Sequence, residues 1–384
     1  MKTTSPSSKK NLTVTILSLS LLTVMAGAAV APALDVIKNY FSGENQLLIQ
    51  MIISVPALFI VITNMFFVKL CKKFRSKTLL MAGLVLYTAG GCVAGVFSNI
   101  YLVLAARALV GIGVGIVMPM STGLLAFYYT RDKQEALMGY SSAMNQMGGV
   151  IATLLSGLFA SISWRASFLV YLMGLISIVL CILFLPNEYI GSENTHGEKG
   201  VFKKNYPFVI AMFLLMFTFF IYPADFAMET AKEGIIGQKY IAVIMASMDL
   251  VAFAGGLAFV HMKKGMGKKI KFAAPILFLA GYLMLNFVSS PVGTIAGSWL
   301  IGFANGEGVP FIISAASKNA GRSAATTVMP LISAALYLAQ FMTPIILLIV
   351  SAALGGANIS HLPYCIAIIL AILFFFWSYT IKED

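Results

Sequence analysis

The segment LIGFANGEGVP (Leu300–Pro310) matches LVGIGVGIVMP (Leu109–Pro119) when the sequence is shifted by 191 residues. The shift places leucine on leucine, two glycines on two glycines and proline on proline. It also aligns two further regions, Pro32-Ala33 with Pro223-Ala224 and Lys72-Lys73 with Lys263-Lys264. Because a single offset close to half the chain aligns three separated regions, we infer an internal repeat.

The composition is typical of a membrane protein. Of 384 residues, 59% are hydrophobic and only 10% are charged, and the mean hydropathy is +0.91. A soluble domain of this length could not bury so much apolar surface. Apolar runs of about 20 residues, long enough to cross a hydrocarbon core of about 30 Å as a helix, recur along the chain. We therefore expect an all-α membrane protein.

Charge clusters and groups of Gly, Ser, Asn and Pro divide the apolar runs into twelve expected spans. The spans cover residues 12–35, 46–68, 78–97, 100–124, 137–160, 166–186, 207–228, 239–261, 272–289, 292–317, 326–353 and 361–381. The N-terminal stretch that ends in GAAVAPA also resembles a secretory signal peptide. We expect a first membrane helix instead, because the apolar run is long and a second run follows at once.

Basic residues are distributed unequally between the two sides of the expected spans. Of the 26 lysines and arginines, Arg107 lies within a span, and the side opposite the termini carries only Lys38, Arg165, Lys232 and Lys239. All others lie on the side of the termini, which the positive-inside rule makes cytoplasmic. The net charge of +12 is therefore explained by the orientation of the chain in the membrane and by contact of its cytoplasmic loops with anionic lipids. We expect no nucleic-acid partner.

The longest polar loop on the cytoplasmic side is NEYIGSENTHGEKGVFKKNY, residues 187–206. It separates six spans from six, so we expect an N-terminal bundle at 1–186, this linker, and a C-terminal bundle at 207–384. Parallel repeats of six spans are one architecture of secondary transporters, with the substrate site between the halves.

The chain resembles the major facilitator superfamily over nearly its whole length, which implies two pseudo-symmetric six-helix bundles. VKLCKKFRSKTLL (68–80) occupies the place of the family's basic loop motif, with Val68 and Lys72 replacing its first glycine and its acid. LAARALVGIG (104–113) resembles the family's fourth-span motif, with Arg107 and Gly111 matching. SWRASF (163–168) resembles the common W-R-x-x-F junction, and VAPAL (30–34) resembles many drug exporters of this superfamily.

The exporter motif of the fifth span is only partly present. The pattern G-x8-G-x3-G-P-x2-G-G would begin at Gly139 and continue through Gly148 to Gly157. Ala152-Thr153 stands in place of Gly-Pro, and Ser156 replaces the first glycine of the last pair. The resemblance therefore supports membership of the superfamily more strongly than export by antiport.

Ionisable residues inside the expected spans are the main candidate functional residues. An intramembrane charge costs about 2.5–3.5 kcal/mol on insertion scales, so it persists where it is paired, hydrated or neutralised by a proton. We expect Glu307, Asp249, Arg107 and Asp35 to take part in proton coupling. The resemblance implies a proton-transfer role for Arg107, which could instead tie helices together, and Glu307 and Asp249 could be structural acids. Asp35 and Asp225, near the outer ends of their spans, could be gate residues or solvated helix ends.

Uncharged polar residues supply further candidates. Such groups either hydrogen-bond a substrate or hold helices together, and both alternatives stay open. The predicted substrate-binding residues are Arg107, Asn145, Gln146, Asn305, Glu307, Tyr337 and Gln340. We interpret the charged residues Glu229, Lys232, Glu233 and Lys239 as an ordinary solvated loop.

These features predict a monomeric, proton-coupled secondary transporter of a bacterial plasma membrane, with both termini cytoplasmic. We favour export of small amphipathic or drug-like compounds. Import of a small anionic metabolite with protons, and a non-transporting receptor on the same fold, are the alternatives. The sequence has no G-x-x-x-x-G-K-[ST] loop and no H-E-x-x-H motif, so we expect no enzyme activity, cofactor or metal site.

Overall fold

The computed structural model describes residues 6–129, 131–189, 201–354 and 361–381. Every regular element among these residues is a helix. The chain divides into two compact units, one formed by Met1–Phe41 with Val55–Asn194 and the other by Ser42–Ser54 with Thr195–Asp384. We call them the N-terminal unit and the C-terminal unit.

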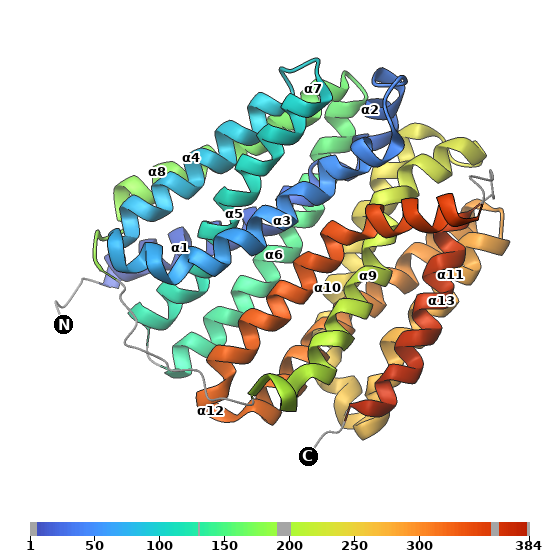
Figure 1. The fold of residues 1–384 in the computed structure, drawn as a ribbon. Coiled ribbons are helices and arrows are strands. Elements are labelled where there is room, and N and C mark those ends of the chain that lie inside the picture. Colours follow the sequence, from blue (N-terminus) through green and yellow to red (C-terminus); the bar gives the residue numbers. More distant parts are fainter. Residues whose placement is uncertain (1–5, 130, 190–200, 355–360, 382–384) are drawn as a thin grey trace. The chain divides into compact units, whose positions relative to one another are not determined.

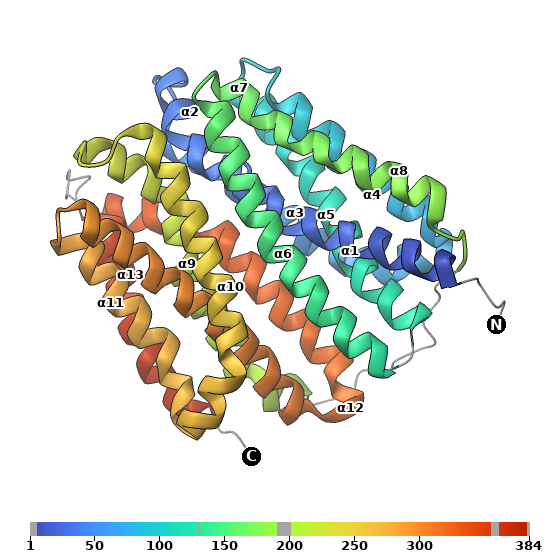
Figure 2. The ribbon, with the colours of Figure 1, turned by 180° about the vertical axis from the view of Figure 1, so that it is seen from behind.

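The N-terminal unit contains most of the first half of the chain. Its α-helices are α1 (Pro6–Ala28), α2 (Leu34–Tyr40), most of α3 (Gln46–Lys73), α4 (Ser76–Ala94), α5 (Ile100–Tyr128), α6 (Arg131–Ala160), α7 (Trp164–Ser167) and α8 (Gly174–Phe184). The 3-10 turns η1 (Ala31–Ala33) and η2 (Phe168–Met173) connect some of them. Helix α1 packs on α5 and α6, and α4 packs on α5 and α8 (Figures 1 and 2).

The C-terminal unit is built around its longest helix. Its elements are α9 (Val201–Glu233), α10 (Gln238–Met266), η3 (Gly267–Phe272), α11 (Ala273–Phe287), α12 (Pro291–Ala353), α13 (Leu362–Trp377) and η4 (Ser378–Thr380). Helix α12 packs against α9, α10 and α11, and α13 packs against α9 and α11. Figure 1 shows α11 and α13 lying side by side in this unit.

Ten segments of the described residues are long and apolar enough to cross a membrane. One of them, Gln238–Phe287, covers two predicted spans, because only the short turn η3 separates α10 from α11. The predicted span 292–317 is helical but is not among the ten. Its three glycines, Asn305 and Glu307 between Gly302 and Gly308 lower its hydropathy, which is the same polar content that makes it a candidate site.

The predicted spans 292–317 and 326–353 lie in one helical element, without a loop between them. Helix α12 includes both spans as one helical segment of 63 residues, and its ribbon reverses direction near the α12 label in Figure 1. Residues 318–325, KNAGRSAA, contain no proline and are rich in alanine, so helical hydrogen bonding continues through the polar stretch.

Two other predicted spans are interrupted. The first changes from α1 to η1 and α2 around Pro32, which has no N–H group to continue the helical ladder. The sixth consists of α7, η2 and α8 in succession. Each remains a continuous apolar segment of sufficient length, Lys10–Tyr40 and Trp164–Phe184.

The glycines of the repeat make equivalent contacts in the two units. In the N-terminal unit Gly111 lies against the carbonyl oxygen of Pro56 on α3, so closely that a Cβ atom would not fit. In the C-terminal unit its counterpart Gly302 lies in the same way against the carbonyl oxygen of Met248 on α10. Because each glycine lets two helix backbones approach, the matching segments occupy matching places in their own units.

The predicted linker lies mostly outside the described residues, which omit 190–200. The division of the chain between Asn194 and Thr195 falls inside that linker. The grouping of Ser42–Ser54 with the C-terminal unit was not expected from the sequence. The predicted boundaries at 186 and 207 stay predictions.

Candidate functional site

Glu307 occupies a fully enclosed position on α12. Its side chain is 0% exposed, and neither carboxyl oxygen accepts a hydrogen bond of ordinary geometry from a described residue, although the backbone N–H of Ala274 at the start of α11 acts on the carboxyl. The preceding Gly306 is pressed against the carbonyl oxygen of Ala252 on α10. The following Gly308 faces Leu215 of α9 and Ala274 of α11. The two flanking glycines thus let three helices close around the carboxyl.

Burial affects the balance between the ionised and the neutral form of the Glu307 carboxyl. An ionised carboxylate without hydrogen bonds is far more costly to bury than a neutral carboxylic acid. Enclosure by the three helices therefore favours the neutral, protonated side chain. Ionisation requires that water, a cation or a hydrogen-bond donor reach it in another conformation.

Asn305, the predicted neighbour of Glu307 in the site, lies on another face of α12. Its side chain is half-buried, and its Oδ1 atom has no hydrogen-bond partner among the described residues. Two residues along a helix correspond to a rotation of about 200°, so the two side chains point in nearly opposite directions. The structure does not bring them together.

Arg107 is buried at the junction of three segments of the N-terminal unit. It donates hydrogen bonds to the hydroxyl of Tyr171 on η2 and to the carbonyl oxygen of Ala26 at the end of α1. The side chain is 0% exposed. These contacts favour a role in holding helices together, while the predicted roles in proton transfer and substrate binding stay predictions.

The two other predicted coupling acids differ in their surroundings. Asp249 is half-buried on α10 and interacts electrostatically with Tyr222 of α9, whose hydroxyl lies 2.9 Å from Ser298 Oγ. Asp35 is half-buried in the first turn of α2 and accepts a hydrogen bond of 3.3 Å from Asn39. Asp249 therefore belongs to a polar group inside the C-terminal unit, whereas Asp35 interacts with the helix end that carries it.

The remaining polar candidates fall into separate units. In the N-terminal unit, Asn145 on α6 accepts a 2.8 Å hydrogen bond from Thr23 of α1, and Gln146 is half-buried. In the C-terminal unit, Gln340 on α12 donates a 3.5 Å hydrogen bond to the carbonyl oxygen of Ile53, and Tyr337 is half-buried. Each of the two hydrogen bonds ties helices of one unit, and the substrate-binding role stays a prediction.

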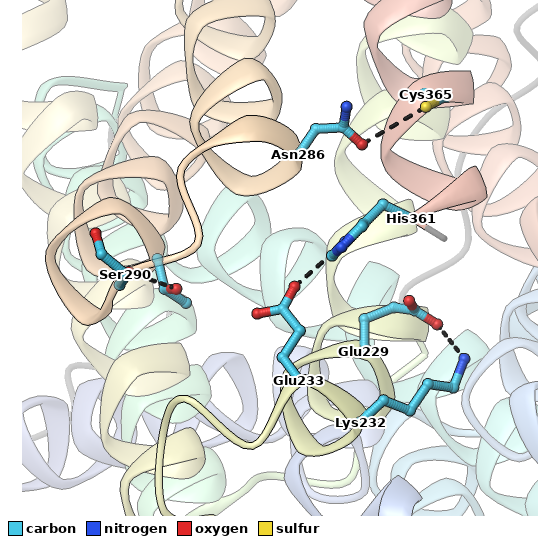
Figure 3. A network of polar contacts seen from close by, with 8 residues as sticks. Glu229, Lys232, Glu233, Asn286, Ser290, His361 and Cys365 are labelled. Atoms are coloured by element: carbon cyan, nitrogen blue, oxygen red, sulfur yellow. Dashed lines mark hydrogen bonds and ion pairs between the residues drawn. The ribbon is translucent and has the colours of Figure 1, made fainter. Parts of the chain in front are cut away.

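The interpretation of Glu229, Lys232, Glu233 and Lys239 as a solvated loop is wrong. The first three lie within α9, where Glu229 is only 7% exposed, and Lys239 is an exposed residue at the start of α10. Figure 3 shows Glu229 directed at Lys232, 2.5 Å away, and Glu233 directed at His361, with 3.2 Å between Oε1 and Nδ1. The sequence did not indicate that α9 continues to Glu233, because the charged residues at its end suggested a loop.

The burial of Asp225 was not predicted from the sequence. It is 1% exposed, and its Oδ1 atom accepts a 2.6 Å hydrogen bond from Nε2 of Gln50 on α3. With Glu229 and Glu233 it follows a spacing of four residues, which places all three acids on one face of α9. This four-residue spacing is the feature of the sequence that could have predicted an acidic face on α9. A solvated helix end, one of the two alternatives for Asp225, is excluded.

A metal centre has no support in the described part of the chain. No group of three His, Cys, Asp or Glu side chains lies close enough there to hold an ion. The cysteines Cys71, Cys92, Cys181 and Cys365 are free thiols.

A family model described as "Major Facilitator Superfamily" matches residues 16–344, which is most of the chain. The chain belongs to the Major Facilitator Superfamily. The expected all-helical membrane fold of two six-helix bundles is therefore confirmed, and the family consists of membrane transporters.

Curated relatives of the chain differ in what they transport. The chain is 23% identical over 39% of its length to the riboflavin transporter RibZ of Clostridioides difficile, covering 33% of it. It is 21% identical over 62% to the sialic acid transporter NanX of Escherichia coli, covering 61% of it. It is 24% identical over 49% to the multidrug efflux pump SdrM of Staphylococcus aureus, covering 43% of it. The matches thus span about a third to three fifths of these relatives.

Solved structures confirm the fold at low sequence identity. A bacterial homologue of the human lysosomal transporter Spinster, in an inward-facing and occupied conformation, superposes with a TM-score of 0.78. The match covers 99% of this chain and 98% of that chain at 14% identity. At this identity the likeness shows the fold alone.

Proposed function

We propose that the protein is a proton-coupled secondary transporter that exports small amphipathic or drug-like compounds. The observation that carries the proposal is the carboxyl of Glu307, which is completely buried in α12 and accepts no hydrogen bond of ordinary geometry from a described residue. An acid kept in an apolar interior is a functional candidate by default, because its burial costs stability.

The proposed cycle uses the protonation state of Glu307. The acid is neutral while α9, α10 and α11 enclose it, and it releases its proton when a conformational change admits water from the other side. In an exporter, proton and cargo compete, so binding of one favours release of the other. Asp249 of the same unit is the second candidate proton carrier, and Arg107 and Asp35 are candidates for modulating roles.

Two features support export. VAPAL (30–34) resembles drug exporters, and one relative is a multidrug efflux pump. Five of the seven predicted substrate-binding residues, Asn145, Gln146, Asn305, Tyr337 and Gln340, are amides and a phenol, which suit an uncharged or weakly polar cargo more than a strongly ionised one.

A second candidate function is proton-coupled import of a small anionic metabolite. The relative with 62% coverage is a sialic acid transporter, and sialic acid is an anion. The guanidinium of Arg107 is the expected anion partner, but its hydrogen bonds to Tyr171 and Ala26 already use part of its donor set. This observation makes import the weaker candidate.

The distribution of basic residues supports an orientation with both termini in the cytoplasm. With bacterial relatives among the matches, we place the protein in a bacterial plasma membrane, with anionic lipids around its cytoplasmic loops and with protons and a small molecule as its ligands.

The test is flux of an uncharged lipophilic fluorescent compound in proteoliposomes under an imposed pH gradient. Glu307→Gln keeps the size of the side chain and removes its ionisation, and Glu44→Gln, an exposed carboxyl, is the matched control. We expect the gradient to accelerate export by the wild type and by Glu44→Gln but not by Glu307→Gln. Equal gradient dependence in all three proteins would refute the role of Glu307, and movement of cargo together with protons would support import.

A further inference from the structure

The connection between α10 and α11 carries a dense group of basic residues. Residues 263–271, KKGMGKKIK, contain five lysines and no acidic residue. They form the end of α10 and most of η3, and we call them the lysine turn. Gly267 has a φ of +54°, in the region that favours glycine, so the chain passes from α10 into η3 without a longer loop. The lysines are therefore gathered on one short turn.

Three lysines of the turn are available to an external anion. Lys264, Lys268 and Lys269 are exposed and make no hydrogen bond or ion pair with another described residue. Like charges repel one another over a distance of about 8 Å at physiological ionic strength. An anion that contacts more than one of these ammonium groups relieves their repulsion. The turn is therefore suited to a ligand with more than one negative charge.

The first and the last lysine of the turn lie against aromatic rings. Nζ of Lys263 lies 5.6 Å from the ring centre of Phe259 and 5.9 Å from that of Phe311, and Nζ of Lys271 lies 5.3 Å from that of Phe272. Ammonium groups are attracted to ring faces at such distances. Lysines at the ends of membrane helices extend their charges to the interface. The lysine turn is therefore expected at the depth of the lipid headgroups.

An aromatic cluster adjoins the lysine turn. The ring of Phe272 packs against those of Phe375 on α13 and Tyr379 on η4, with centres 5.1 and 4.8 Å apart. Lys271 donates a hydrogen bond of 2.9 Å to the carbonyl oxygen of Ile381, which ties the end of this segment to the turn. Aromatic side chains are enriched at membrane interfaces. Ammonium groups beside apolar rings match the headgroup and the adjoining acyl chains of a lipid.

The counterpart of the turn in the N-terminal unit already has an acidic residue. The 191-residue shift aligns the lysine turn with residues 72–80, around the connection between α3 and α4. There the N–H of Ser76 donates a hydrogen bond of 2.8 Å to the carbonyl oxygen of Glu188, so the chain itself brings a carboxylate to the basic loop. The residue aligned with Glu188 is Tyr379, a member of the aromatic cluster. The lysine turn therefore lacks the corresponding carboxylate.

We propose that the lysine turn binds an anionic phospholipid whose headgroup carries two phosphates, with its acyl chains beside Phe272 and the other rings of the aromatic cluster. Lys264, Lys268 and Lys269 pair with the phosphates, which supply the negative charge that Glu188 supplies in the N-terminal unit. The proposal rests on the proposed orientation, which places the turn at the cytoplasmic leaflet. It assigns the general contact of the loops with anionic lipids to one specific site.

Native mass spectrometry of the full-length protein in detergent tests the site, because it counts bound lipids and gives their affinities. The probe is cardiolipin, with phosphatidylglycerol and phosphatidylcholine for comparison. We expect the wild type to bind one cardiolipin at least about tenfold more tightly than either. Lys264→Gln/Lys268→Gln/Lys269→Gln should weaken this binding at least about tenfold, whereas Lys264→Arg/Lys268→Arg/Lys269→Arg keeps the charges and should retain it.

The matched control is Lys69→Gln/Lys72→Gln/Lys73→Gln, which removes three exposed lysines at the end of α3 and should change the affinity less than about threefold. Tyr379→Glu alters a side chain that is 61% exposed and introduces the acid of the other copy. It should weaken binding of cardiolipin, and it provides the test if the glutamine variant of the turn does not fold, which size-exclusion chromatography shows.

Three results would overturn the site. They are an equal loss of affinity in the two glutamine variants, equal binding of cardiolipin and phosphatidylcholine, and binding of inorganic pyrophosphate as tight as that of cardiolipin, which would identify a soluble anion as the ligand. The measurement uses neither cargo nor a gradient and does not depend on orientation in a membrane. Glu307→Gln should bind cardiolipin as the wild type does, so failure of the transport proposal is distinguished from failure of the lipid site.

Discussion

The hydroxyl of Tyr171 accepts a hydrogen bond from Arg107 and donates one of 2.7 Å to the carbonyl oxygen of Ala26. Arg107 donates to the same carbonyl, and its Cζ atom lies 5.3 Å from the centre of the Tyr171 ring. Three segments, α1, α5 and η2, are thus joined at one buried point. The arginine of the family's fourth-span motif stabilises the N-terminal unit through this junction.

Tyr171→Phe should therefore destabilise the protein. The substitution removes one acceptor of the buried guanidinium and one donor to Ala26, and an unsatisfied buried polar group costs about 1–3 kcal/mol. Thermal unfolding in detergent measures the effect. Tyr101→Phe, which changes a side chain that is 63% exposed, is the control and should unfold at the wild-type temperature. Equal stability of both variants would contradict the structural role of the junction.

Gly306→Ala should destabilise the C-terminal unit and impair its function. A Cβ atom at this position would collide with the carbonyl oxygen of Ala252 on α10, which is rigid backbone. Overpacking of this kind costs about 1–3 kcal/mol and would separate α10 from α12 beside Glu307. Gly265→Ala on α10 meets nothing within 4 Å and should be neutral. Unfolding temperatures of the two variants, measured side by side, check the difference.

Arg165→Lys should also lower stability. The guanidinium of Arg165 donates to the carbonyl oxygens of Gly95 and Val96 at 3.0 and 2.8 Å and to the hydroxyl oxygens of Ser98 and Tyr40 at 2.8 and 3.1 Å. A lysine ammonium cannot reproduce this planar set of donors. We expect a loss of about 1–3 kcal/mol in thermal unfolding. Arg75→Lys, at an exposed position, is the control, and an equal effect there would show that the set of donors is unimportant.

Cys71, beyond the apolar part of α3, should react slowly with iodoacetamide at neutral pH. Burial raises the pKa of its thiol to about 11, so the reactive thiolate is scarce. The folded state binds the proton more tightly than the unfolded state, so the resulting stabilisation is complete below the ordinary thiol pKa and is lost as the pH rises through 11. We expect labelling at about pH 8 to be at least about tenfold slower than that of a small free thiol.

A variant that keeps Cys71 as its only cysteine provides the measurement, followed by mass spectrometry. Its labelling rate should keep rising with pH above the point at which an ordinary thiol has reached its maximum. A rate that levels off near the ordinary thiol pKa would show that water reaches the sulfur freely.

The sequence was sufficient for the fold because the informative features are local. Apolar runs predict spans by length, and the repeat aligns Gly111 with Gly302, which make the same kind of close helix contact in the two units. The burial of Glu307 also followed from its apolar surroundings. In contrast, the ends of helices depend on competition between charge and helix propensity, so the end of α9 was predicted too early and a loop was expected within α12 where the structure has none.

Tertiary partners could not be derived from the sequence. Gln50 and Asp225 are 175 residues apart, and nothing in their local sequences indicates that one donates to the other. The complete enclosure of the Glu307 carboxyl likewise depends on how α9, α10 and α11 pack around it. Such information is contained only in the folded arrangement.

The aligned segments of the two halves make similar glycine contacts, but only the C-terminal copy contains an acidic residue. The counterpart of Glu307 under the 191-residue shift is Ile116, which is 4% exposed and packs at Gly83. One copy of the duplicated segment thus fills this place with hydrocarbon and the other with an acid. We therefore expect Glu307→Ile to fold as the wild type does and to lack the ionisable group that the proposed transport cycle needs.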